Sequence, residues 1–398
     1  MRTIRRSSVV ITALALSAAC DRDAMQPIAG ISATLAPAPA GRGRLEEFVY
    51  VANHENANVL GYAVDPVTGA LTPVPGSPFP TQGAPEYMAI DERGQFVYVP
   101  NAGSGTVSGF AIDQTTGLLT PITGSPFAAE GFPDAVAIAR SGPFAYVTNG
   151  GSNDVSAYRI DPVTGALIAV PGSPFATGNL PRYPAVHRSN RFAYIANAGS
   201  NDISAYAIDP MTGVLSPLAG SPFPAGTYPN SLVIDPKGRF LYVCNYFSGN
   251  ISAYSIAASN GALVPVPGSP FAAGAGTNQL AIDPSGRFAY AANGISNTIS
   301  AYSVDRQTGA LTSLSGSPFP GGGSPNSAAV DATGRFLYLA DFGSGSVTGY
   351  VIDQESGALT PVLGSPFPAG GIGPFSVATA RPILKENEGA EAITASRN

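Results

Sequence analysis

Three charged residues, Glu86, Asp134 and Arg182, stand 48 residues apart, and each directly follows a proline. A carboxylate at either of the first two positions could act as a general base that activates a water molecule. The Arg182 guanidinium could stabilise an oxyanion, hold a carboxylate or phosphate, or only neutralise the two carboxylates. These residue types could support hydrolysis at a carbonyl carbon, so we take Glu86, Asp134 and Arg182 as the candidate catalytic residues.

The same position recurs further along the chain with uncharged side chains, which are Asn230, Asn278, Asn326 and Phe375. Amide and carboxylate oxygens suit Ca²⁺, so a calcium ion at this position is conceivable. The separation of these residues around a repeated structure argues against direct coordination by all of the oxygen donors. A polar lining bridged by water is the alternative. We therefore predict no metal centre and no other cofactor, with calcium left open.

The elements that position these residues are set by a strict repeat. The tetrapeptide GSPF opens at Gly76 and returns every 48 residues until Gly364. Seven copies at six equal spacings, without slippage, indicate seven supersecondary units of one size, because any insertion would break the period. Each unit then needs only its neighbours to bury its faces.

One unit, 192–239, reads as four short strands and no helix. The runs FAYIAN, ISAYAID and NSLVID are rich in β-branched and aromatic residues, and the turns between the runs contain Asp, Asn, Pro and Gly. The remaining strand carries Pro217 and Pro222, so it belongs at a sheet edge, where proline also blocks aggregation. Seven such units predict an all-β fold, a seven-bladed β-propeller over 45–383. The last innermost strand, in GPFSVATARP, has no following unit and should close the ring on the blade that begins at Phe48.

Aromatic residues that depart from the repeat gather at one end of the blades. They fall at the entry to the innermost strand and in the loop after the FxY strand, two places that share one end of an up-and-down blade. We take this aromatic rim, together with His54, Glu55 and the three asparagines, as the candidate ligand-binding surface. The aromatic residues concerned are Tyr87, Phe132, Tyr183, Tyr228, Tyr246, Phe247, Phe342 and Phe375. The alternative is that these rings only plug the channel and stabilise loops.

The N-terminal 20 residues have the features of an export signal. Arg2, Arg5 and Arg6 precede a short apolar run, and small residues lead to Cys20. We predict that Cys20 is lipidated and that the protein is a bacterial cell-envelope lipoprotein, with secretion after ordinary cleavage as the alternative. Residues 21–44 read as a flexible tether and 384–398 as a polar tail.

Charge and cysteine content limit the partners. The formal net charge is −6 with 12% charged residues, which argues against nucleic acid as a partner. Only two cysteines are present, and Cys244 lies in a strand as a small core residue. We expect a monomer that meets a membrane only through its lipid.

The motifs carry a family resemblance. FVYVAN, FAYVTN, FAYIAN and FLYVCN, with segments such as SNDISAYAIDPMTG and AIDPSGRF, resemble the YVTN and lactonase-family seven-bladed propellers, which include 6-phosphogluconolactonase-like proteins. The resemblance covers 48–383. The lack of Trp argues against a WD40 propeller.

For function, the resemblance implies lactone hydrolysis, but lactonase-type members carry a His after the Pro that opens an innermost strand. That position is never His here. We therefore favour binding of a small ligand, glycan or protein at the rim. Lactone hydrolysis is the alternative, and a structural surface protein is the second alternative.

Overall fold

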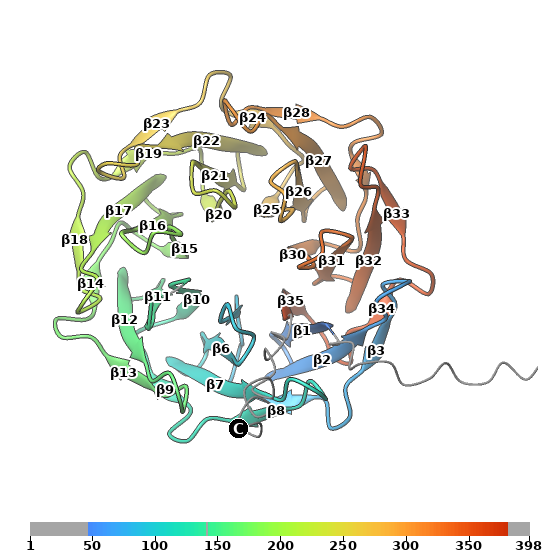
Figure 1. Ribbon diagram of the computed structural model, residues 1–398, viewed down its shortest axis with the longest axis horizontal. Coiled ribbons are helices and arrows are strands. Elements are labelled where there is room, and N and C mark those ends of the chain that lie inside the picture. Colours follow the sequence, from blue (N-terminus) through green and yellow to red (C-terminus); the bar gives the residue numbers. More distant parts are fainter. Residues whose placement is uncertain (1–46, 141, 381–398) are drawn as a thin grey trace, which may run out of the picture. The chain divides into compact units, whose positions relative to one another are not determined.

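The computed structural model describes residues 47–140 and 142–380. Seven sheets surround a central channel in the manner of propeller blades, and no helix occurs among the described residues (Figure 1). The predicted seven-bladed propeller is therefore confirmed. The export signal, Cys20, the tether and the tail lie outside the described residues and stay predictions. No helix in the described ranges is long and apolar enough to cross a membrane.

The strands are short and repeat in the same order. The innermost strands are β5 (Ala89–Ile90), β10 (Pro133–Ile138), β15 (Pro181–Val186), β20 (Pro229–Ile234), β25 (Thr277–Ile282), β30 (Pro325–Val330) and β35 (Pro374–Ala380). The second strands are β1 (Glu47–Asn53), β6 (Phe96–Asn101), β11 (Phe144–Asn149), β16 (Phe192–Asn197), β21 (Phe240–Asn245), β26 (Phe288–Asn293) and β31 (Phe336–Asp341). The third strands are β2 (Asn58–Val64), β7 (Thr106–Ile112), β12 (Asp154–Ile160), β17 (Asp202–Ile208), β22 (Asn250–Ile256), β27 (Thr298–Val304) and β32 (Ser346–Ile352).

The outermost strand of each blade is split into two pieces, where the sequence predicted one broken strand. The first pieces are β3 (Leu71–Pro73), β8 (Leu119–Pro121), β13 (Leu167–Ala169), β18 (Leu215–Pro217), β23 (Leu263–Pro265), β28 (Leu311–Ser313) and β33 (Leu359–Pro361). The second pieces are β4 (Phe79–Pro80), β9 (Phe127–Ala128), β14 (Phe175–Ala176), β19 (Phe223–Pro224), β24 (Phe271–Ala272), β29 (Phe319–Pro320) and β34 (Phe367–Pro368). Both pieces pair antiparallel with the third strand of the same blade.

The GSPF serine bridges this gap. In blade 1 the Gly61 amide donates to Ser77 Oγ at 2.9 Å, and in blade 4 the Ala205 amide donates to Ser221 Oγ at 2.9 Å. The serine hydroxyl thus supplies the acceptor that the interrupted strand cannot, because a buried amide needs a partner. The phenylalanine of the motif packs toward the next blade, as Phe79 does in the core shared with Val97 and Phe110. The interpretation of GSPF as a fold element is confirmed.

The ring closes as predicted. Strand β35 pairs antiparallel with β1, so that the C-terminal strand completes blade 1 beside β2. The apolar core lies between neighbouring blades, and the closure is of the same kind: Val49 and Val377 of blade 1 pack with Tyr338 of blade 7. Cys244 is buried in the core between blades 5 and 6.

Blade 2 departs from the others at its innermost strand, because β5 keeps only two residues. Pro85 and Glu86 still pair with β6, but at Tyr87 the chain pairs with the next blade: the Tyr87 amide donates to the Asp134 carbonyl at 3.0 Å, in a parallel bridge to Ala135. This path carries the Tyr87 side chain away from its own sheet.

A hydroxyl on each FxY tyrosine ties its blade to the next. The Tyr50 hydroxyl donates to the Gly117 carbonyl at 2.8 Å, and at the closure the Tyr338 hydroxyl donates to the Gly69 carbonyl at 2.8 Å. Both bonds are buried, so removal of one hydroxyl leaves a carbonyl without its partner.

We predict that Tyr338→Phe lowers the free energy of unfolding by about 1–3 kcal/mol, because a buried acceptor is left unpaired at the ring closure. Denaturant unfolding followed by far-UV circular dichroism measures the change. Tyr206→Phe is the matched control, since the equivalent residue of blade 2 is already Phe110, and it should cost less. Equal losses in the two variants would contradict the importance of the closure bond.

Candidate functional site

The rim brings His54 and Glu86 together. His54 follows β1, and its Nε2 lies 3.3 Å from Glu86 Oε1, while its Nδ1 lies 3.3 Å from Glu55 Oε1. The hydrogen bond to Glu86 raises the pKa of His54 above its usual value, against the opposing effect of burial. Glu86 is 6% exposed, and its second oxygen, Oε2, has no hydrogen-bond partner among the described residues. A buried carboxylate oxygen therefore remains without a protein partner beside a histidine.

Asp134 and Arg182 form the neighbouring ion pair. Asp134 Oδ2 contacts Arg182 Nη1, and Arg182 Nε lies 3.3 Å from Asn230 Oδ1. Asp134 is 3% exposed, and burial raises its pKa although the Arg182 guanidinium acts in the opposite direction. Arg182 keeps part of its side chain accessible to solvent, whereas its partner does not. The guanidinium is thus oriented by Asp134 and Asn230 and can still meet a ligand.

The asparagines join the rest of this ring by direct hydrogen bonds. Asn230 Nδ2 lies 3.3 Å from the Asn278 carbonyl oxygen, and Asn278 Nδ2 donates to the Pro325 carbonyl at 3.1 Å. Asn326 Nδ2 donates to the Phe375 carbonyl at 2.8 Å. Each side chain reaches the same position of the next blade, so these three residues hold the innermost strands together.

Tyr87 fills the channel at this level. Its hydroxyl lies 3.1 Å from Asn326 Nδ2 and 3.5 Å from Asn230 Nδ2, and its ring packs against Tyr183 and Phe375 with centroids 5.3 and 4.9 Å away. Those partners come from four other blades, which places the ring at the centre, and Tyr87 is 1% exposed. Tyr87, Tyr183 and Phe375 therefore pack as a plug, as the alternative interpretation of the aromatic residues expects.

The outer aromatic residues are arranged differently. Tyr228, Tyr246 and Phe247 form a cluster, with centroids 4.9 Å apart for Tyr228 and Phe247 and 5.1 Å for Tyr246 and Phe247. Phe247 is 66% exposed, and Phe132 on another blade is 62% exposed. Large apolar side chains in contact with water at one rim are typical of an interaction surface.

Backbone geometry adds to this observation. Phe132 and Tyr228 both have φ of 58°, at a position where blade 6 has Gly276 with φ of 70°. This left-handed conformation favours glycine, so bulky residues there are uncommon. The rim thus has aromatic residues, Phe132 and Tyr228, at a position whose backbone conformation favours glycine.

Phe342 lies closer to the charged cluster. Its ring centroid is 6.5 Å from that of His54 and 6.1 Å from that of Phe375. It therefore forms an apolar wall on one side of the histidine.

The prediction of no metal centre is not tested, and a calcium ion at the ring stays an open alternative. Among the residues that the structure describes, no three His, Cys, Asp or Glu side chains converge as metal ligands. The Arg182 guanidinium already pairs with the Asp134 carboxylate, so it supplies part of the positive charge that a bound cation would supply there.

The sequence placed His54 among the ligand-binding residues of the rim and not among the candidate catalytic residues. The structure joins His54 and Glu86 across blades 1 and 2. The sequence feature that could have indicated this contact is that both residues lie at the same end of the blades. His54 lies in the loop after a second strand, and Glu86 lies at the entry to an innermost strand. The other histidine, His187, lies apart, with Nε2 2.6 Å from the Gly238 carbonyl oxygen at the opposite end.

Comparison with known proteins gives the family. The model of the family described as Lactonase, 7-bladed beta-propeller matches residues 43–131, 121–225, 185–277 and 264–371. The search of curated proteins found no match.

Solved structures show the same fold. A candidate 6-phosphogluconolactonase from Bacteroides fragilis is 19% identical with a TM-score of 0.74, over 84% of this chain and 98% of that one. The periplasmic gluconolactonase of Pseudomonas aeruginosa is 18% identical with a TM-score of 0.73, over 85% of this chain and 99% of that one. At such identity the likeness concerns the fold. The family model, in contrast, spans the seven blades, and the chain belongs to the lactonase family of seven-bladed β-propellers.

Proposed function

We propose that this protein hydrolyses a lactone at the rim of the channel. The observation that carries the proposal is the charged cluster of His54, Glu86, Asp134 and Arg182, contributed by four successive blades, in which Glu86 keeps one oxygen without a protein partner. Membership of the lactonase family supports the same reaction. So do the names of similar structures, a candidate 6-phosphogluconolactonase and a gluconolactonase, although fold alone does not fix an activity.

The reaction needs a base and an oxyanion partner, and the cluster contains both. Glu86 takes a proton from water as the water oxygen attacks the lactone carbonyl carbon. The negative charge that develops on the carbonyl oxygen is stabilised by the Arg182 guanidinium, which Asp134 and Asn230 hold in place. The ring C–O bond then breaks, and the leaving alkoxide takes the proton back from Glu86. The product is an open-chain hydroxy acid, and no cofactor enters the balance.

His54 acts as a positioning residue in this scheme. Its hydrogen bond to Glu86 Oε1 fixes the carboxylate, so that Oε2 is the oxygen left without a protein partner. Its second contact, to the exposed Glu55, makes an imidazolium favourable at this place.

Binding without turnover is the second candidate. The Tyr228, Tyr246 and Phe247 cluster favours it, because exposed and half-buried aromatic rings provide apolar contact area for a sugar ring or a protein side chain. Under this candidate Phe247→Ala abolishes binding of a ligand from a glycan array. Under the lactonase proposal the same variant changes KM more than kcat, since the cluster lies apart from Glu86.

We predict that Glu86→Gln lowers kcat for the best substrate at least about 100-fold and leaves KM within a few-fold, because the amide cannot accept the proton. A pH-stat measures acid release from a panel of sugar and aliphatic lactones, with the spontaneous rate subtracted. Glu355→Gln, an exposed change in an outer turn, is the matched control and should keep full activity. Absence of hydrolysis by the unaltered protein across the panel would contradict the proposal and favour binding.

A second prediction concerns pH and stability. The folded-state pKa of His54 is raised, so its contribution to stability is fully present below its unfolded pKa of about 6.5 and is lost as pH rises through the raised value. We expect His54→Gln to lower the melting temperature more at pH 6 than at pH 9. In a Glu86→Gln background this pH dependence should shrink, because the main partner is gone. An equal loss at both pH values would show that the imidazolium does not stabilise the fold.

A further inference from the structure

A cavity lies at the end of the channel opposite the rim. It has a volume of about 360 Å³, and the apolar side chains that line it stand at one repeat position in four consecutive blades: Ile90, Ile138, Val186 and Ile234. These residues are the last of β5, β10, β15 and β20, whereas the rim lies at the opposite ends of these strands. Since Tyr87 fills the channel at the rim, a molecule in this cavity would enter from the side of the tight turns.

Two arginines stand at the margin of this cavity. Arg140 and Arg188 line it from blades 3 and 4, and both are exposed. Arg140 Nε pairs with Glu92 Oε1 at 2.8 Å, whereas Arg188 makes no hydrogen bond or ion pair with another residue in 47–140 or 142–380. The remaining carboxylate, Asp235, is occupied by backbone amides, including that of Phe240 at 2.8 Å. Arg188 is therefore the cation of this lining that pairs with neither Glu92 nor Asp235.

These two arginines do not belong to the repeat. The arginines that belong to the repeat pack over the phenylalanine that follows them, as Arg287 does at 5.0 Å from the Phe288 ring centroid. Arg287 also donates to the Gln354 carbonyl of the next blade at 2.8 Å. Arg140 and Arg188 occupy a different position, where blades 6 and 7 have Pro284 and Ala332. Residues that depart from a repeat are candidates for function.

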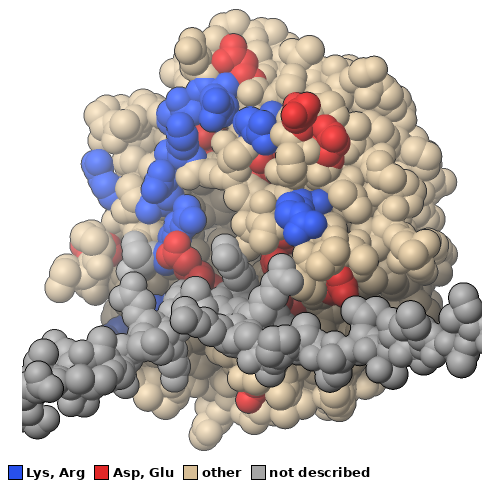
Figure 2. All heavy atoms as spheres, turned by 45° about the vertical axis from the view of Figure 1, so that its right-hand side comes forward, with Lys and Arg blue, Asp and Glu red and all other residues tan. Residues whose placement is uncertain are grey.

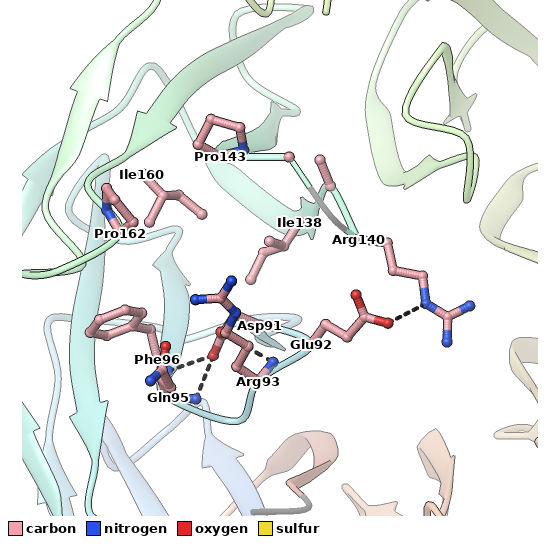
Figure 3. A pocket seen from close by; sticks show the side chains of 12 residues that line it. Asp91, Glu92, Arg93, Gln95, Phe96, Ile138, Arg140, Pro143, Ile160 and Pro162 are labelled. Carbon is pink, nitrogen blue, oxygen red and sulfur yellow. Dashed lines mark hydrogen bonds and ion pairs between the residues drawn. The ribbon is translucent and has the colours of Figure 1, made fainter. Parts of the chain in front are cut away.

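A smaller cavity adjoins the first one between blades 2 and 3. Its volume is about 210 Å³, its walls include Phe96, Ile160 and Pro162, and it shares Ile138, Glu92 and Arg140 with the larger cavity. Figure 3 shows the Glu92–Arg140 pair at one side of this space and the apolar side chains at the other. Figure 2 shows that Lys and Arg side chains form a band on one face of the molecule, with carboxylates beside it. Polar and apolar groups thus meet within one connected depression.

We propose that the larger cavity binds an organic anion with an apolar body. The anionic group would contact Arg188 and Arg140, because guanidinium groups pair with carboxylates, sulfonates and phosphates. The apolar body would lie on Ile90, Ile138, Val186 and Ile234 and lose contact with water. The volume falls within the range of small-molecule sites. A bare inorganic anion would leave this apolar floor uncovered, so it is not the expected ligand.

The test uses 8-anilinonaphthalene-1-sulfonate, an anion with an aromatic body, on the full chain. We expect saturable binding with one site per chain, followed by fluorescence, and displacement by octanoate but not by octanol or inorganic phosphate. The double variant Arg140→Gln/Arg188→Gln should bind at least about tenfold more weakly. Arg306→Gln is the matched control, since Arg306 is an equally exposed arginine in an outer turn, and it should bind as the unaltered protein does.

Further variants separate this site from the rim and from unfolding. Val186→Trp fills the floor and should abolish binding while both arginines remain, and each variant is compared at a temperature well below its own melting point. Glu86→Gln and Phe247→Ala should leave binding unchanged, so that failure of the lactonase proposal does not affect this one. No saturable binding, equal binding by the double variant and the unaltered protein, or loss of binding in the rim variants would each overturn the proposal.

Discussion

The hydrogen bond from each FxY tyrosine to the next blade is the interaction on which the ring depends. It occurs once in each of the seven blades, with a distance of 2.7–3.0 Å between the hydroxyl oxygen and the carbonyl oxygen. The first of these bonds joins Tyr50 to Gly117, and the last joins Tyr338 to Gly69. The acceptor must be a glycine, since a Cβ on Gly117 would lie 2.5 Å from the Phe48 ring of the preceding blade and its φ is +73°. The tyrosine and the phenylalanine of one blade thus form a single contact with the turn glycine of the next blade. This contact repeats with the period of the sequence.

Because this contact fixes the spacing between blades, other positions can vary without loss of the fold. The serine of GSPF, the tyrosines and the turn glycines are used for structure in every blade. At both ends of the innermost strands, in contrast, the residues change from blade to blade. Glu86, Asp134 and Arg182 occupy one of these positions at the rim, and Arg140 and Arg188 another at the opposite end. The chemistry of this protein is therefore concentrated in the departures from its repeat.

The irregular segment around Tyr87 in blade 2 separates the rim from the cavity at the opposite end of the channel. Tyr87 leaves its own sheet, bonds to the backbone of blade 3 and fills the channel between side chains of four further blades. The same segment carries Glu86, so the residue that we propose as the base is held on a stretch of chain with an unusual course. This arrangement buries most of Glu86 and Asp134 while it leaves His54 and Arg182 partly accessible. The plug and the candidate active site are consequently one structural feature.

The sequence by itself determined the number of blades, the split outer strand at GSPF, the closure of the ring by the C-terminal strand and the end at which the aromatic residues gather. It could do so because each of these features repeats every 48 residues or breaks that repeat at a readable place. Only the tertiary structure decided that His54 meets Glu86, that Tyr87 is a plug while Phe247 stays exposed, and that a cavity opens beside Arg188. Those features join side chains of different blades across the channel, where the contacts depend on the path of each innermost strand and on the direction of each side chain, and neither of these is recorded in the spacing.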